Sequence, residues 1–238
     1  MFRLGNSTKE ARAPVKNQML AALPKQELQH LLPELEEVTL AFAEVLYEPD
    51  QRISHVYFPN SGMISLVSTV NERSTTAVNI VGKDGIVGLQ VFLGTNVSPN
   101  KAIVQVAGTA LKMKASVLRK ESQKRPLERL LRRYTQALLT QAYQATICNH
   151  FHKINERLAS WMLFMNDQSG SDKFPITHEF MSNMMGVRRE EISKAAAVLQ
   201  RDKLISYGRG RVRILSRAGL EAICCKCYSI ITAKSVKY

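Results

Sequence analysis

A glycine separates two amphipathic segments in the stretch SNMMGVRREEISKAAAVLQRDKLI, residues 182–205. Because glycine ends helices and adopts positive φ readily, we expect one helix to end near Met185 and a second to run from about Arg188 to Arg201. The first helix would begin after Thr177, which is a favourable N-cap residue. Two helices joined by a short glycine-containing turn form a helix-turn-helix.

The second helix of this pair is expected to have two distinct faces. Ile192, Ala195 and Leu199 follow three- and four-residue spacing and should point inward. The opposite face carries polar and small side chains, at Arg189, Glu190, Ser193, Lys194 and Ala197. Arginine can bond guanine O6 and N7, and glutamate can accept from cytosine N4, so this face suits a duplex major groove. A solvated surface with an Arg–Glu pair is the alternative, which the glycine turn and the local positive charge disfavour.

A basic hairpin is predicted directly after the helix-turn-helix. Residues 203–215, KLISYGRGRVRIL, read as two short strands with Gly208 and Gly210 at the turn. Arg209 and Arg211 lie on this hairpin and are candidates for phosphate contacts, which position a protein on DNA without specifying sequence. A helix-turn-helix followed by such a hairpin is a winged helix.

The positive charge of the chain lies in its second half. Residues 1–110 contain 9 Lys/Arg and 10 Asp/Glu, whereas residues 111–238 contain 24 Lys/Arg and 10 Asp/Glu, within a total net charge of +13. This asymmetry indicates a polyanionic partner, with nucleic acid as the first candidate. A membrane surface is disfavoured, because no basic helix has a strongly apolar, aromatic opposite face.

The region from about residue 38 to residue 113 consists of short segments rich in β-branched and aromatic residues. HVYFP, GMISLVSTV and TTAVNIV are examples, and turn signals containing Pro, Asn, Asp or Gly separate them. This spacing predicts an antiparallel sandwich or jelly roll. Residues 17–32 read as short helices around Pro24.

A long helix is predicted over residues 126–150, with proline only at its start. Apolar residues in it follow a heptad pattern that Gln141 weakens. The residues of this seam are Leu127, Leu131, Tyr134, Leu138, Gln141, Ala145 and Cys148. The seam can pack against its own domain or against the same helix of a second subunit, and we favour the homodimer.

The chain has four cysteines, Cys148 and the cluster Cys224, Cys225 and Cys227. The cluster could bind a metal or sense an oxidant, but histidine partners at zinc-finger spacing are missing, so buried thiols on a C-terminal helix are favoured. An enzyme of the cupin type would need several His and Glu metal ligands, and His55 stands alone in the β region. We therefore expect neither enzymatic activity nor a metal. The start of the chain lacks an apolar signal core, which predicts a soluble, cytoplasmic protein.

The predicted order of an antiparallel sandwich or jelly roll, a long helix and a winged helix-turn-helix resembles the CRP/FNR family of bacterial transcription regulators. The matching residues are ITHEFMSNMMGVRREEISKAAAVLQRDKLIS, the wing YGRGRVRIL and the preceding junction CNHFHKINERLASWML. The resemblance implies an α+β fold with an N-terminal cyclic-nucleotide-binding-like β-roll (residues 1–115), a dimerisation helix (116–152) and a C-terminal winged helix-turn-helix (153–238). It also implies double-stranded DNA as ligand and makes RNA polymerase a candidate partner.

The resemblance assigns roles to residues of the second helix and its neighbours. Arg189, Glu190 and Lys194 occupy the base-reading positions, and Arg188 lies where a backbone contact is usual. Thr177 and Ser193 are further candidates for contacts to the DNA backbone.

The chain departs from the cyclic-nucleotide members of the family in the stretch GKDGIVGLQVFLGTNVSPNKAIVQV, residues 82–106. Gln90 stands where a glutamate should accept the ribose hydroxyl, and Asn100-Lys101 stands where an Arg-Ser pair should bind the phosphate. Lysine offers a point charge without bidentate geometry, so we expect no tight binding of cAMP or cGMP. The N-terminal cysteines of the iron–sulfur members and paired haem ligands are also missing. We therefore expect no cofactor, and the sequence identifies no small-molecule effector.

One alternative assigns the basic half to RNA or to an acidic protein, with the β-roll as a structural element. RNA binders use exposed aromatic side chains for stacking, and the predicted reading face has none.

Overall fold

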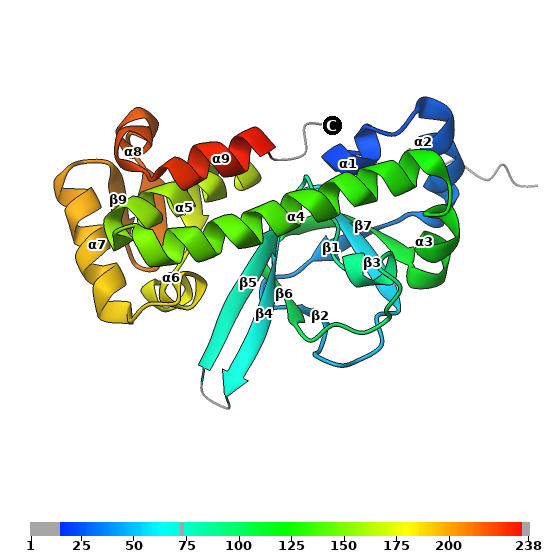
Figure 1. The fold of residues 1–238 in the computed structure, drawn as a ribbon, viewed down its shortest axis with the longest axis horizontal. Helices are drawn as coiled ribbons and strands as arrows, with labels where there is room; N and C mark the ends of the chain where they lie inside the picture. Colours follow the sequence, from blue (N-terminus) through cyan, green and yellow to red (C-terminus); the bar gives the residue numbers. More distant parts are fainter. Residues whose placement is uncertain (1–14, 72–73, 235–238) are drawn as a thin grey trace, which may run out of the picture.

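The computed structural model describes residues 15–71 and 74–234. It shows an α+β protein with a β-roll at one end, a winged helix at the other and one long helix, α4 (Arg125–Phe151), extending from the first to the second (Figure 1). The fold class expected from the sequence is confirmed.

The β-roll is built from two antiparallel sheets. One has the order β1-β7-β3 and the other has the order β2-β6-β4-β5. The strands are β1 (Glu36–Leu40), β2 (Val45–Tyr47), β3 (His55–Pro59), β4 (Met63–Asn71), β5 (Ser74–Val81), β6 (Lys101–Val106) and β7 (Gly108–Lys114). β1 and β2 come from one apolar stretch of the sequence but belong to different sheets, so the chain turns from one layer to the other between them.

Short helices precede and follow the roll. They are α1 (Gln18–Ala21), α2 (Lys25–Leu31), the 3-10 helices η1 (Leu32–Glu34) and η2 (Leu89–Val91), and α3 (Ala115–Glu121). Pro24 separates α1 from α2 and occupies the N-cap position of α2, as expected for a residue that cannot continue a helix.

The C-terminal part of the chain forms the winged helix. Its helices are α5 (Ile154–Ser169), α6 (His178–Met185), α7 (Arg189–Arg201), α8 (Arg217–Ile223) and α9 (Lys226–Lys234), and its strands are β8 (Lys173–Pro175), β9 (Ile205–Gly208) and β10 (Arg211–Ile214). The predicted hairpin of β9 and β10 is joined by β8 in a three-stranded sheet of order β8-β10-β9. Sequence patterns do not predict β8, because a three-residue strand carries no usable periodicity.

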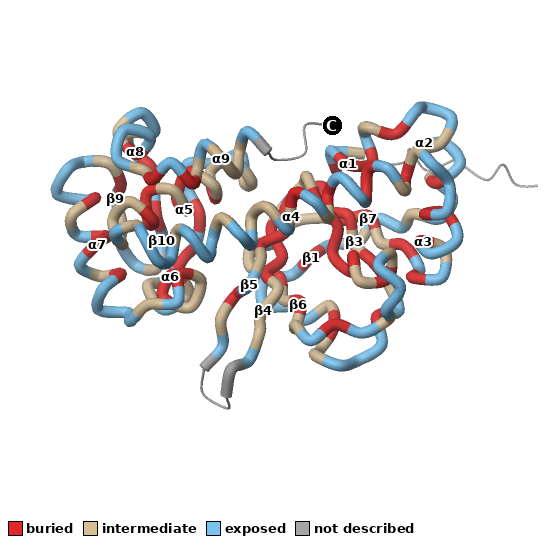
Figure 2. The backbone as a smooth tube through the Cα atoms, viewed as in Figure 1, coloured by how far each residue is buried: buried red, intermediate tan, exposed pale blue. Residues whose placement is uncertain are grey.

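Two hydrophobic cores form, and the burial pattern in Figure 2 shows α4 passing from the first to the second. The first core holds the roll together with Leu127, Leu131 and Tyr134 of α4. The second holds the winged helix and also includes Met63 and Ile80 from the roll. The winged helix is therefore packed against strands β4 and β5.

Among the helices within residues 15–71 and 74–234, none combines the length and the apolar character needed to cross a lipid bilayer.

Candidate nucleic-acid interface

The helix-turn-helix forms from the local signals in its sequence. The side chain of Thr177 caps α6 by accepting a hydrogen bond from the Phe180 N–H at 3.1 Å. Gly186 ends α6 with φ of +62°, and a Cβ placed on it would meet no atom within 4 Å. Glycine is therefore needed at this position for its backbone conformation and not for space.

The second helix, α7, buries one face and exposes the other. Ile192, Ala195, Ala196 and Leu199 are buried in the second core. The carboxylate of Glu191 accepts a hydrogen bond from the Arg188 N–H at 3.0 Å, so this acidic side chain caps the helix start.

The exposed face of α7 carries the expected base-reading residues. Arg189, Glu190 and Lys194 are positioned on the side of α7 that lies away from the second core, and Arg188 stands at the N-cap. The small side chain of Ala197 continues this face toward the carboxyl end of the helix. The structure thus places these side chains together on one surface, while their contacts to bases stay a prediction.

Ser193 lies in a polar network inside the domain. Its hydroxyl donates to the Arg189 carbonyl at 3.0 Å and lies 2.9 Å from Nδ1 of His178. The His178 ring stacks on Tyr207 of β9, with centroids 4.2 Å apart and planes 12° from parallel. This network joins α6, α7 and the wing, and it engages the hydroxyl that was expected to contact DNA.

No local pattern in the sequence indicates the pairing of His178 with Tyr207, because the two residues lie on elements that meet only in the folded domain. Burial lowers the pKa of His178, and the positive charge of Arg189 lowers it further. Both effects favour the neutral imidazole beside the exposed basic face.

The wing alternates buried and exposed side chains along β10. Val212 and Ile214 are buried, whereas Arg211 and Arg213 are exposed on the opposite side of the strand. Arg209 is exposed at the hairpin turn, where it adopts φ of +50°. The arginines therefore project away from the core, as a phosphate-contacting wing requires.

A buried arginine links the turn of the helix-turn-helix to the long helix. Arg157 of α5 donates through Nη2 to the Asn149 side-chain oxygen at 2.6 Å and to the Met185 carbonyl at 2.5 Å. Met185 is the last residue of α6, so the guanidinium fixes the end of this helix against the carboxyl-terminal part of α4.

The expected dimer seam on α4 divides into two parts. Leu127, Leu131 and Tyr134 are buried in the core of their own chain, and Leu138 packs against it. Cys148 points toward α9, with its Sγ 3.5 Å from Sγ of Cys225. For these residues the structure favours packing within the chain, because the roll and α9 cover this side of the helix.

A different apolar stripe faces outward on the second half of α4. Leu139, Tyr143 and Ile147 are exposed by 44%, 66% and 45%. Of the predicted seam, Gln141 is half-buried and Ala145 is exposed, and the helical spacing places both on a different side of α4 from this stripe. Heptad counting selected a different face of α4, because it identifies a hydrophobic pattern but not the core that covers part of it, and the role of the seam in a dimer stays a prediction.

One residue of the outward stripe, Leu139, also lines an apolar groove of about 730 Å³ between α4, α5, β5 and α9. Leu139 and Ala142 line it from the helix, and Val78 and Leu93 line it from the roll. Val78 and Leu93 are exposed by 53% and 56%, which is unusual for large apolar side chains on neighbouring elements.

The stretch aligned with a nucleotide-binding cassette has two polar side chains with partners inside the roll, although Oε1 of Gln90 is buried without a hydrogen-bond partner among the described residues. Gln90 of η2 donates to the hydroxyl of the buried Ser98 at 3.2 Å. Lys101 pairs with Glu48, with 3.1 Å between Nζ and the carboxylate oxygen. The lysine that stands at the phosphate position is thus engaged by an acidic neighbour.

Comparison with known proteins identifies the C-terminal segment. Residues 156–223 match the family model of the Crp-like helix-turn-helix domain. This range runs from α5 to the end of α8 and contains the capped turn, the exposed face of α7 and the wing. No curated protein sequence matches the chain significantly.

Solved structures match over most of the chain. FixK2 from Bradyrhizobium japonicum superposes with a TM-score of 0.69 at 16% identity, covering 80% of this chain and 98% of FixK2. TTHB099, a CRP-family transcriptional regulator from Thermus thermophilus, gives 0.64 at 20% identity, covering 79% and 95% of the two chains. TTHA1359, a CRP/FNR-family regulator from the same organism, gives 0.64 at 18% identity, covering 79% and 97%. At these identities the likeness shows the fold.

We expect Gly186→Ala to lower the free energy of unfolding by about 1–2 kcal/mol, because an L side chain is strained at φ of +62°. Gly208→Ala is the matched control, since a Cβ there also meets no atom within 4 Å and its φ lies outside the left-handed region. Chemical denaturation followed by circular dichroism measures both variants. Equal losses for the two alanines would show that the turn does not depend on the left-handed conformation.

Proposed function

We propose that this chain, whose C-terminal domain belongs to the Crp-like helix-turn-helix family and whose fold is that of the CRP/FNR regulators, binds an inverted-repeat site in duplex DNA as a homodimer and regulates transcription. The observation that carries the proposal is the exposed face of α7, where Arg189, Glu190 and Lys194 stand together beside a basic wing.

Each group on this surface has a distinct task. Arg189 and Lys194 donate to base-edge acceptors, and Glu190 accepts from a base amino group. Arg188, Arg209 and Arg211 contact phosphates and set the register of α7 in the groove. Thr177 and Ser193 are the further candidates for contacts to the DNA backbone, and as helix cap and network hydroxyl they also hold the reading face in position.

The homodimer places two reading faces on one DNA. The partner covers the outward stripe of Leu139, Tyr143 and Ile147 and the adjoining groove, with the carboxyl-terminal half of its own α4 against this one. Two α7 helices related by the twofold axis then enter successive major grooves about one helical turn apart, which matches an inverted repeat.

Cyclic AMP is not the signal in this proposal. The phosphate-binding arginine is replaced in sequence, and the remaining Lys101 is paired with Glu48. In this proposal the protein acts in the cytoplasm, where the DNA is. It is a regulator rather than an enzyme, and RNA polymerase is a further partner.

Selection of bound duplexes from a random DNA pool tests the function directly. We expect an enriched palindromic motif with half-sites about one turn apart, since a twofold-symmetric protein reads symmetric DNA. Single-stranded RNA serves as the competitor and should not displace the selected duplex. Recovery of a non-palindromic pool, or displacement by the RNA, would favour the alternative of an RNA-binding regulator.

Two arginine substitutions separate base reading from phosphate contact. Arg189→Ala should weaken binding to the selected site by about 1–3 kcal/mol and relax preference at one base pair. Arg211→Ala should weaken binding to all sequences and reduce the dependence of affinity on salt concentration. Gln200→Ala, at the exposed far end of α7, is the control and should leave both properties unchanged. Fluorescence anisotropy with matched and mismatched duplexes at several salt concentrations measures the affinity, the base preference and the salt dependence. An unchanged base preference in Arg189→Ala would refute the assignment of Arg189 to base reading.

Leu139→Asp should convert the dimer to monomers and abolish tight binding to the inverted repeat, because it places a charge in the apolar stripe. Leu215→Asp is the matched control, since Leu215 is 50% exposed and lies outside the stripe on the winged helix. Sedimentation velocity reports the oligomeric state of both variants. A Leu139→Asp protein that stays dimeric would remove α4 as the contact surface.

A further inference from the structure

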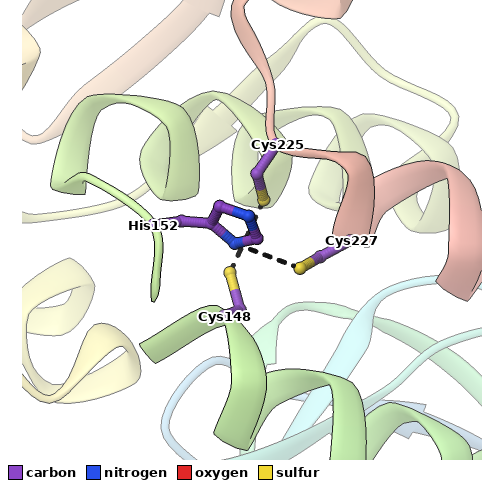
Figure 3. Close-up of side chains that lie close together, drawn as sticks. All are labelled: Cys148, His152, Cys225 and Cys227. Atoms are coloured by element: carbon purple, nitrogen blue, oxygen red, sulfur yellow. Dashed lines mark hydrogen bonds between the residues drawn. The ribbon is translucent and has the colours of Figure 1, made fainter. Parts of the chain in front are cut away.

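Three cysteines and a histidine from distant parts of the sequence converge beside the last turn of α4 (Figure 3). Cys148 lies in this last turn, and His152 follows directly after it. Cys225 lies in the link between α8 and α9, and Cys227 lies in the first turn of α9. The three Sγ atoms and one ring nitrogen all lie within 4.8 Å of one another.

The sequence pattern favours plain buried thiols, because no histidine follows the CCxC cluster at zinc-finger spacing. That expectation leaves out His152, which stands 75 residues before Cys227 in the chain but 3.3 Å from it in space, measured from Nδ1 to Sγ. α4 and α9 pack against each other and bring the two halves of the set together. Cys148 and His152 are four residues apart, so the helix presents both on one side.

We propose that Cys148, His152, Cys225 and Cys227 bind a single Zn²⁺ ion in a tetrahedral Cys3His site. Zinc takes such sets with Zn–S distances of about 2.3 Å and Zn–N distances of about 2.0–2.1 Å. A tetrahedron of these bonds separates two sulfurs by about 3.8 Å and a sulfur from a nitrogen by about 3.5 Å. The separations of 3.5 Å between Cys148 and Cys225 and of 3.3 Å between Cys227 and His152 are close to these values.

The surroundings of the thiols suit thiolate ligands. Cys225 and Cys227 are buried, with 5% and 2% exposure. Gln144 of α4 donates through Nε2 to Sγ of Cys227 at 3.1 Å, and the Ser160 hydroxyl lies 3.0 Å from Sγ of Cys225. A donor such as the Gln144 amide neutralises part of the negative charge on a coordinating sulfur and orients it, whereas the Ser160 hydroxyl donates to the Glu156 carbonyl and accepts from the Cys225 N–H.

One bound ion explains the convergence of the three cysteines and the histidine better than a disulfide or an iron–sulfur cluster does. A disulfide between Cys148 and Cys225 would leave Cys227 and His152 converging without a role. An iron–sulfur cluster contains several irons and bridging sulfides, so it needs its protein thiolates further apart than the ligands of one ion. Zn²⁺ is also the ion that mixed thiolate and imidazole ligands in tetrahedral geometry favour.

On binding, the three thiols release their protons to solvent and the neutral imidazole donates its lone pair. The ion then joins the end of α4 to α9 through bonds that cross from the long helix to the winged-helix domain. α9 is thereby fixed to α4, in addition to its contacts with α5.

Metal analysis of the untagged, full-length protein tests the site. We expect about one zinc per chain, as in other closed structural sites. Cys225→Ser and Cys148→Ser should each lose most of this zinc. Cys224→Ser is the matched control, because its thiol is adjacent in sequence but outside the set, and it should keep the wild-type zinc content.

Cobalt replacement supplies a measurement that does not depend on the folding of variants. Co²⁺ added to the chelator-treated wild-type protein should give the intense visible bands of tetrahedral cobalt and a thiolate-to-metal charge-transfer band, both absent after Zn²⁺ is added in excess.

His152→Cys should keep a tetrahedral spectrum, whereas His152→Ala should weaken metal binding at least tenfold. Wild-type protein without bound metal and without a cobalt spectrum would overturn the proposal, as would iron with acid-labile sulfide, or equal zinc loss in Cys224→Ser.

Discussion

The change of packing partners halfway along α4 determines the arrangement of the rest of the molecule. The first half of this helix completes the core of the β-roll through Leu127 and Leu131, and the second half leaves the roll with an apolar stripe on its outer side. Since one continuous helix does both, the position of the winged helix relative to the roll depends on what contacts the second half. This part of the helix packs against α9 and is hydrogen-bonded to the buried Arg157, and the proposed second subunit would contact it as well.

The winged helix could be predicted because its signals are local. The N-cap at Thr177, the left-handed Gly186 and the three- and four-residue spacing on α7 each act within a few residues. The same spacing predicts that Arg189 and Lys194 are exposed, because it places them away from the buried face of α7. The β-roll was predictable as a class, but the assignment of β1 and β2 to different sheets depends on pairings between distant strands.

Features that depend on contacts between two distant segments could not be predicted from local patterns. The heptad seam on α4 was real as an apolar pattern, yet Tyr134 and Cys148 turn inward because the roll and α9 are there to cover them. His152 carries no local signal as a ligand, since its three partners become neighbours only when α9 packs on α4. Tyr207 likewise meets His178 only when the wing has formed.

The guanidinium of Arg157 couples the last carbonyl of α6 to Asn149 on α4, and the hydroxyl of Thr76 on β5 donates to the carbonyl of Asn183 in the same helix. A rotation of the winged helix away from the roll would have to break both attachments, and the first is a hydrogen bond from a charged guanidinium, which is stronger than one between neutral groups. These two hydrogen bonds therefore oppose rotation of the winged helix against the roll. A substitution at Arg157 would weaken this attachment while leaving the exposed side chains of α7 and the wing unchanged.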